Sequence, residues 1–253
     1  MKPATSRGMG RSPIKDMWSY PPHRILVPVD FGEASGRALK VARLIGASHN
    51  ATITVLHAES LEAPAYFTRS QVRALEKQRD AARGEAARFL ATFAARHQKG
   101  EVETIVVEGS PAAGIAQAAR KSDHVVMGTH GRRGAARWWA GSVAERVVRG
   151  AEVPVMVVRA DTPASDALFK HLVVVEGSVA FDGAARRYAR GLAEAFAGTV
   201  QPDPVSPLDT VALQAATLLV FAKASAVGFN TFVTGAEHLL RTCRRPALFV
   251  PPM

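Results

Sequence analysis

The strongest constraint on the fold is an apolar run that ends in a series of spaced glycines. The run from Val125 to Met127 ends on Gly128, and Gly131 follows after two intervening residues. Nine residues later come Gly141 and Ser142, which open a stretch with a helical pattern. A buried strand that leads through a glycine-bearing loop into a helix start is a geometry that holds phosphate, because glycine lets the backbone approach the anion and the first helix amides are unpaired. The stretch therefore predicts a phosphate-binding loop.

The remainder of the first half predicts an α/β fold with a parallel sheet. Five short apolar runs have the length and composition of strands: Arg24–Val29, Thr52–Ala58, Glu101–Val107, Val125–Gly128 and Pro154–Val158. Helical patterns lie between them, at 30–45, 70–97, 111–121 and 143–149. Because strands and helices alternate, we expect a parallel sheet with helices on both faces. Ligands of such sheets bind at the carboxyl ends of the strands, where Asp30, Ala58 and Gly128 stand.

The second half repeats the first in a shortened form. Pairing Pro154 with Pro246 aligns the last apolar runs of the two halves. On this alignment the three glycines have the following counterparts: Val220 for Gly128, Lys223 for Gly131 and Val233 for Gly141. The chain between Thr199 and Thr217 is too short for a loop, a long helix and a third strand. We therefore expect the second copy to lack one edge of its sheet.

The two copies differ in their glycines but not in their helix starts. Ser142 with Glu145, and Thr234 with Glu237, both have the spacing of a capping box. Because the second copy keeps the helix start without the glycines, we expect ligand binding in the first half, and none or a different ligand in the second. The predicted organisation is a basic disordered tail at 1–21, a ligand-binding domain at 22–160 and a degenerate, shortened domain at 168–253.

Charge and composition narrow the choice of partner and compartment. The net charge of +10 raises nucleic acid as a partner, but much of it is arginine spread along helical segments, with no aromatics spaced for stacking on bases. We therefore favour a solvated surface over a nucleic-acid interface. Cys243 is the single cysteine, which excludes an internal disulfide, and no apolar run reaches the length of a membrane helix. We expect a cytoplasmic protein that does not enter a membrane.

The first half resembles the universal stress protein family over roughly residues 22 to 160. The ATP-binding pattern of that family is Gly, two residues, Gly, nine residues, Gly, then Ser or Thr, and the spaced glycines match it with Ser142 in the last position. Further matches are the segments Pro28–Asp30, Leu56–Ala58 and Met127–Gly131. The resemblance implies a Rossmann-like fold, of the adenine nucleotide alpha hydrolase type, with five parallel strands. It also implies binding of ATP or another adenine nucleotide, and leaves open whether Mg²⁺ accompanies it.

The resemblance also assigns roles to individual residues and to the second copy. The residues that it places around the nucleotide are Pro28, Asp30 and Ala58 at the adenine and ribose, Gly128, His130 and Gly131 in the loop under the phosphates, Gly141, Ser142 and Val143 at the helix start, and Met127, to which no separate part of the nucleotide is assigned. Ala58 stands where the family usually has valine, so one wall of the adenine pocket is thinner. Tandem members resemble a dimer within one chain, paired through the fifth strands; whether two chains also pair is left open.

Several residues have structural interpretations beside these functional ones. Asp30 could cap its helix as well as bind a ligand, and Ser142 could be only an N-cap. Ser142 is not expected to be a nucleophile, because no Gly-x-Ser-x-Gly elbow surrounds it. His57 is interpreted as a core or interface histidine. The eight histidines show no metal-ligand spacing, so we expect no metal site built by the protein.

Three classes of function follow. We favour a nucleotide-dependent stress-response or regulatory protein, in which ATP orders the loop from Thr129 to Ala140. An enzyme that uses ATP is the second class; without a Walker lysine, a kinase signature or a general base, we expect slow hydrolysis or autophosphorylation at most. The third class is an interaction module that binds protein partners without nucleotide.

Overall fold

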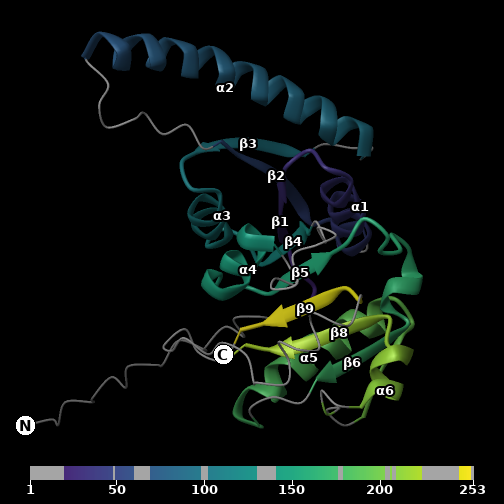
Figure 1. Cartoon of the computed structure of the whole chain (residues 1–253). Helices are drawn as coiled ribbons and strands as arrows, with labels where there is room; N and C mark the ends of the chain where they lie inside the picture. Colours follow the sequence, from purple (N-terminus) through teal and green to yellow (C-terminus); the bar gives the residue numbers. More distant parts are fainter. Residues whose placement is uncertain are drawn as a thin grey trace, which may run out of the picture.

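The strands of this protein join into one mixed sheet. The computed structural model describes residues 20–47, 49–59, 69–97, 102–129, 141–175, 179–202, 206, 209–223 and 245–251. Within these residues the sheet has nine strands in the order β3-β2-β1-β4-β5-β9-β8-β6-β7. Figure 1 shows β5 and β9 side by side near the middle of the molecule, where the first half of the chain meets the second.

The first half contains parallel strands separated by helices, which confirms the predicted α/β class. Its strands are β1 (Arg24–Val29), β2 (Thr52–Glu59), β3 (Glu103–Glu108), β4 (His124–Gly128) and β5 (Val155–Val158), and its helices are α1 (Glu33–Ala47), α2 (Arg69–His97), α3 (Pro111–Ala119) and α4 (Gly141–Gly150). Within the described residues, these five strands pair only in parallel with one another. Pro111 stands at the first turn of α3 as predicted, but Ser110, at the N-cap position, makes no side-chain capping bond.

The second half continues the same sheet in the opposite direction. Its elements are η1 (Asp166–Phe169), β6 (His171–Val175), α5 (Val179–Ala195), β7 (Thr199–Val200), α6 (Thr210–Ala215), β8 (Leu218–Ala222) and β9 (Ala247–Val250). β9 runs antiparallel to β5, with Met156 opposite Leu248. The order β7-β6-β8-β9 corresponds to β2-β1-β4-β5, and the described residues contain no counterpart of β3.

The register of the two halves corrects the sequence alignment in the fourth strand. Gly128 lies opposite Val158 in β5, and Ala222 lies opposite Val250 in β9, so Ala222 and not Val220 is the counterpart of Gly128. The proline alignment therefore holds for the last strand and fails for the fourth. Gly128 to Val155 is a step of 27 positions whereas Ala222 to Ala247 is a step of 25, so the connection in the second half is shorter by two residues. The predicted counterparts Val220 for Gly128 and Lys223 for Gly131 are therefore wrong.

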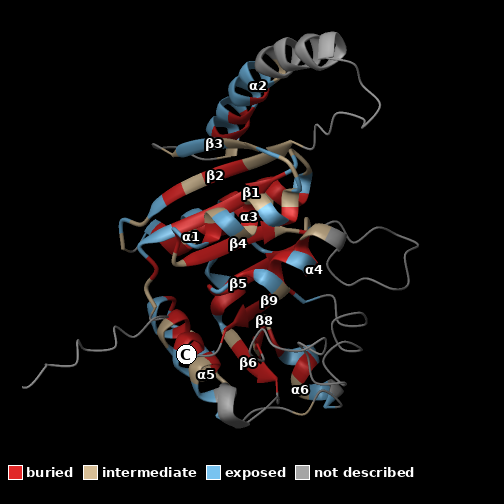
Figure 2. Ribbon diagram, turned by 90° about the vertical axis from the view of Figure 1, so that its left-hand side faces the viewer, coloured by how far each residue is buried: buried red, intermediate tan, exposed pale blue. Residues whose placement is uncertain are grey.

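Two apolar cores lie on the two faces of the sheet. One core joins α1, α2 and α5 to side chains such as Val27, Val126 and Val174, and the other joins α3, α4 and α6 to side chains such as Leu26, Val125 and Leu219. Successive residues of a strand thus enter opposite cores. Figure 2 shows the central strands as buried, while β3 at the edge is largely exposed. Burial on both faces explains why these strands are continuous apolar runs in the sequence.

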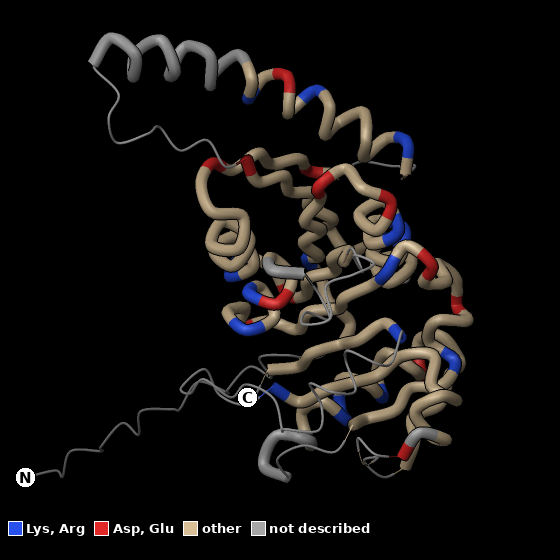
Figure 3. Tube along the Cα trace, viewed as in Figure 1, with Lys and Arg blue, Asp and Glu red and all other residues tan. Residues whose placement is uncertain are grey.

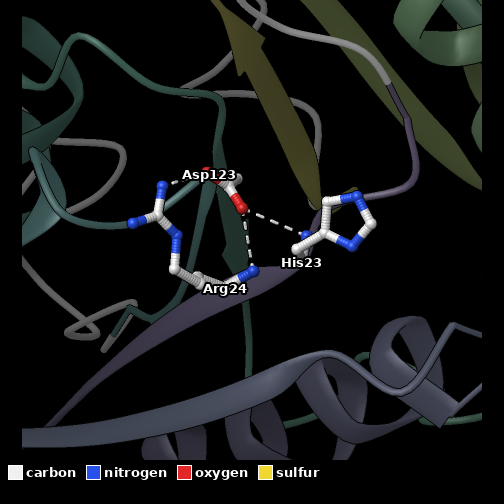
Figure 4. A network of polar contacts seen from close by, with 3 residues as sticks. All are labelled: His23, Arg24 and Asp123. Carbon is white, nitrogen blue, oxygen red and sulfur yellow. Dashed lines mark hydrogen bonds and ion pairs between the residues drawn. The ribbon is translucent and has the colours of Figure 1, made fainter.

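Charged side chains are dispersed over the surface of the described residues. Figure 3 shows Lys and Arg on several helices and loops, interspersed with Asp and Glu. The side chains of Arg24 and Asp123 and the backbone of His23 form a local network at the amino ends of β1 and β4, away from the carboxyl ends where a ligand is expected (Figure 4).

Asp123 is the centre of this network. Its Oδ2 accepts hydrogen bonds from the backbone N–H groups of His23, at 3.1 Å, and Arg24, at 2.9 Å, and its Oδ1 accepts from the Arg24 guanidinium at 2.8 Å. In the second half Thr217 occupies the same position, and its Oγ1 accepts from the backbone N–H of His171 at 2.9 Å. Both side chains therefore tie the start of the first strand of their half to the start of the fourth.

The Asp123→Ala variant is expected to lose about 1–2 kcal/mol of unfolding free energy at pH 7, mainly through the lost bonds to the backbone. Burial alone would raise the pKa of Asp123, but the hydrogen bonds and charge of Arg24 and the two backbone N–H groups outweigh it, so the pKa lies below its usual value. This stabilisation is complete above the unfolded pKa of about 3.9 and is lost as the pH falls through the folded value. Urea unfolding should show the difference from wild type shrinking below about pH 4.

Asp161→Ala is the matched control for this measurement. Asp161 pairs with Arg159 at 3.6 Å, but its side chain is 72% exposed, so the variant should stay within about 0.5 kcal/mol of wild type. An Asp123→Ala variant as stable as the control at pH 7 would contradict the role given to this carboxylate.

Candidate functional site

The predicted base-binding residues meet at the carboxyl ends of β1, β2 and β4. Pro28 is buried near the end of β1, and Val29 pairs with His57, so Asp30 follows β1 beside Ala58, which still belongs to β2 and pairs with Val107. Met127, at the end of β4, belongs to the core under α3 and α4. Ala58 and Val143 pack against that same core and are half-buried. The structure thus gathers an apolar wall on the α3 and α4 side of the sheet edge.

Asp30 is held in a tight turn directly after β1. Its Oδ1 accepts hydrogen bonds from the backbone N–H of Gly32, at 3.1 Å, and from the Ser35 hydroxyl, at 2.6 Å. The Asp30 backbone N–H in turn donates to the Ser35 Oγ at 3.1 Å. Ser35 is buried while Asp30 is exposed. The carboxylate is therefore fixed from inside the protein and presented at the surface.

Asp30 is not the N-cap of α1, so the structural alternative for this residue is wrong. The Gly32 carbonyl accepts the first hydrogen bond of the helix, from the Gly36 N–H at 3.1 Å, and α1 begins at Glu33. Between Asp30 and Gly32, Phe31 has a φ of 62°, which is not helical. The sequence offered no signal for this turn, because Phe is not a residue that favours positive φ.

Aromatic packing holds Phe31 in this conformation. Its ring centroid lies 4.4 Å from that of His57, 4.7 Å from that of Phe89 and 5.6 Å from that of Phe93. His57 itself donates from Nδ1 to the Val29 carbonyl at 2.9 Å. The predicted role of His57 as a core histidine agrees with these contacts. A left-handed Phe costs about 1–2 kcal/mol, and the packing from β2 and α2 offsets that strain.

Gly128 is required by packing between β4 and α1. A Cβ at this position would lie 2.5 Å from the Ala34 carbonyl carbon, 2.6 Å from its oxygen and 2.7 Å from the Ser35 nitrogen. No side chain fits at these distances without moving backbone. Gly128 therefore has a structural reason to be glycine, in addition to any role toward a ligand, and it brings the start of α1 against the end of β4.

α4 begins at Gly141, the third glycine of the predicted pattern. Ser142 belongs to the first turn, and Val143 follows it. The sequence predicts a capping box between Ser142 and Glu145, and the Ser142 side chain lies outside the described part of the structure. Oε1 of Glu145 accepts from Arg149 Nε at 3.0 Å and from an Arg149 terminal nitrogen at 2.8 Å, and Oε2 is buried with no hydrogen-bond partner among the described residues. Glu145 therefore pairs with a residue one turn further along α4.

Some predicted features lie outside the described residues. These are His130, Gly131, Cys243, the second capping box of Thr234 and Glu237, and the tail up to residue 19. Within the described part of the chain no group of three or more His, Cys, Asp or Glu side chains is arranged to hold a metal ion. No described helix combines the length and apolarity needed to cross a membrane.

The family model and the curated relatives that match this chain all point to the same family. Residues 22–159 match the model of the universal stress protein family. A universal stress protein from Thermus aquaticus is 32% identical over 142 residues, which are 53% of this chain and 97% of that protein. One from Mycobacterium tuberculosis is 31% identical over 142 residues, which are 55% of this chain and 45% of that protein. The chain thus spans less than half of the mycobacterial relative's length.

The fold of the whole chain also has a counterpart among solved structures. The crystal structure of a universal stress protein from Archaeoglobus fulgidus superposes with a TM-score of 0.66. The superposition covers 93% of this chain and 98% of that chain, at 16% sequence identity. The likeness therefore extends beyond the residues matched by the family model, and it concerns the fold.

Proposed function

We propose that this chain, which belongs to the universal stress protein family, binds one adenine nucleotide in its first half and acts as a nucleotide-dependent regulatory protein of the stress response. The observation that carries the proposal is the position of Gly141 and Ser142. The last two residues of the glycine pattern form the first turn of α4, in the connection that leaves the carboxyl end of β4. A helix start at that edge of a parallel sheet presents unpaired amides and the positive end of the helix dipole to an anion.

The residues around this edge fit an adenine nucleotide. Ala58 and Met127 offer an apolar wall for the base, and the carboxylate of Asp30, fixed by Ser35, offers an acceptor for ribose hydroxyls. The triphosphate would extend from there to the start of α4. Mg²⁺ would enter with the phosphates of ATP, because it keeps several waters and binds chiefly through phosphate oxygens. His130 and Gly131 complete the proposed loop.

We further propose that the chain is a tandem protein whose halves, 22–160 and 168–253, pair like a dimer. The antiparallel contact of β5 with β9 supports this pairing through the last strand of each half. The repeated strand order supports a second copy without a counterpart of β3 among the described residues. The spacing of Gly131, Gly141 and Ser142, which the second half does not repeat, supports a single nucleotide site. Residence in the cytoplasm is part of the same proposal.

Calorimetric titration of the nucleotide-free chain with ATP is expected to give a stoichiometry of one nucleotide per chain. Only the first half has the glycine pattern, so the second half should add no site. A matched titration with inorganic triphosphate should give a weaker affinity, because triphosphate lacks the base and the ribose that the apolar wall and Asp30 are proposed to bind. Two ATP molecules per chain would contradict the single site, and no ATP binding would contradict the proposed function.

A further inference from the structure

Lys223 is a buried lysine at the carboxyl end of β8. It is 3% exposed and directly follows the strand. Its backbone N–H donates to the Val250 carbonyl at 2.7 Å, just as the N–H of Thr129 donates to the Val158 carbonyl at 2.8 Å. Lys223 therefore occupies, in the second half, the position that Thr129 occupies in the first, where the proposed phosphate loop begins.

The ammonium group of Lys223 contacts the first half of the chain. Nζ donates to the carbonyl of Ala151 at 2.5 Å. Ala151 directly follows α4, and its N–H donates to the Val147 carbonyl at 2.8 Å, so it continues the hydrogen bonding of that helix. The contact therefore places a buried cation at the carboxyl end of α4, which is the negative end of the helix dipole.

The electrostatics of this contact favour a defined position for the helix end. Burial lowers the pKa of Lys223 to about 8, and the charge of Glu152 acts in the opposite direction. A buried ammonium is costly unless it is paired and hydrogen-bonded. Breaking the hydrogen bond to Ala151 would leave the charge of Lys223 buried without a partner, and this cost keeps the contact in place. Ala144, Val147 and Val148 are buried along the same helix, and a continuous helix transmits a displacement of one end to the other as a rigid element.

The antiparallel junction of the two halves makes this contact possible. α4 runs from the carboxyl end of β4 to the amino end of β5. Because β9 is antiparallel to β5 and parallel to β8, the carboxyl end of β8 lies at the amino end of β5. A single ten-residue helix thus has its first turn at the proposed phosphate site and its last turn at Lys223.

We propose that Lys223 is a positioning residue through which the second half fixes α4 for phosphate binding. The inference rests on the proposed function and gives the second half a role in it. With the ammonium bound to Ala151, the first-turn amides of α4 are held where the phosphates of the nucleotide arrive. Without this hydrogen bond, the carboxyl end of α4 has no side-chain partner. The amides of the first turn then occupy several positions instead of one.

The Lys223→Met variant tests the proposal through the difference between ATP and adenosine. The variant is expected to bind ATP about fivefold more weakly or worse, which is the lower end of usual coupling effects. Its affinity for adenosine should stay unchanged, because adenosine does not reach α4's first turn. Both dissociation constants are measured by calorimetry on the full chain, together with its melting temperature.

Lys170→Met is the matched control. Lys170 Nζ donates to the carbonyls of Phe196, at 2.6 Å, and Ala197, at 3.4 Å, which lie just beyond the end of α5. The same chemistry is thus removed at a helix end that is remote from α4. This variant should change neither dissociation constant, whatever it does to the melting temperature.

The outcomes separate this inference from the proposed function. Equal losses for ATP and adenosine, or no loss for ATP, would overturn the positioning role while leaving nucleotide binding intact. If Lys223→Met does not fold, Lys223→Gln, which keeps an N–H donor without the charge, is measured in the same way and should again lose affinity for ATP alone. An unaltered chain that binds no ATP would overturn the proposed function, and this inference with it.

Discussion

The Gly131→Val variant is expected to lose ATP affinity by at least about a hundredfold, or about 2.7 kcal/mol, while the chain stays folded. Gly131 is the second glycine of the pattern and precedes α4 by ten positions. A branched side chain there would occupy the space through which phosphate approaches the backbone, and it would resist the positive φ that glycine adopts freely. Calorimetry gives the affinity, and circular dichroism with thermal melting shows whether the fold is retained.

Gly84→Val is the control for this effect. Gly84 lies on the exposed side of α2, and a Cβ there would meet no atom within 4 Å. The same substitution at this position should leave ATP binding unchanged. Unaltered affinity in Gly131→Val would remove the loop from the nucleotide site, and loss of affinity with loss of the fold would show that Gly131 acts through stability.

The Gly128→Ala variant is expected to lose about 3 kcal/mol of unfolding free energy, at the upper end of usual overpacking costs. The added Cβ would lie 2.5 Å from the backbone of Ala34, so either β4 or the start of α1 must move. Backbone cannot rotate away as a flexible side chain does, which makes this contact harder to relieve than most. Chemical denaturation at pH 7 measures the loss.

Gly84→Ala should shift stability in the opposite direction. Nothing lies within 4 Å of the added Cβ, and alanine is favoured over glycine inside a helix by about 0.5–1 kcal/mol. The two variants thus compare the same substitution, glycine to alanine, at a crowded position and at an open one. A Gly128→Ala variant within about 0.5 kcal/mol of wild type would show that α1 does not press on β4 as closely as the structure has it.

The close packing of Gly128 also changes how the glycine pattern is interpreted. From the sequence, glycines absent from the second copy are expected to serve a ligand rather than the fold. The close approach of Ala34 shows that Gly128 serves the fold of the first half, so its absence from the second copy is not evidence of ligand binding. The argument for a nucleotide then depends on Gly131, Gly141 and Ser142.

The strands and helices were predictable because their signals are local. Continuous apolar runs such as 24–29 and 171–175 become strands that are buried on both faces. Alternation with helical patterns then implied a parallel sheet. The observed boundaries of the elements differ from the predicted ones by only a few residues. For example, α4 begins at Gly141 rather than at Val143.

The features that the sequence could not provide depend on contacts between distant segments. The counterpart of Gly128 is Ala222 because the connection to the last strand is shorter by two residues, and a single pair of prolines could not reveal that shift. Phe31 adopts a positive φ because rings from β2 and α2 hold it. The sequence alignment placed Lys223 opposite Gly131, as a position where the second copy lacks a glycine. In the structure its side chain joins the end of α4 to the second half.

The crystal structure of the full chain grown with ATP tests the central claim most directly. The account predicts phosphate density against the backbone N–H groups of Gly141 and Ser142, with adenine against Ala58 and Met127 and the ribose beside Asp30. A nucleotide bound elsewhere, or saturating ATP that leaves the start of α4 without phosphate, would contradict the account.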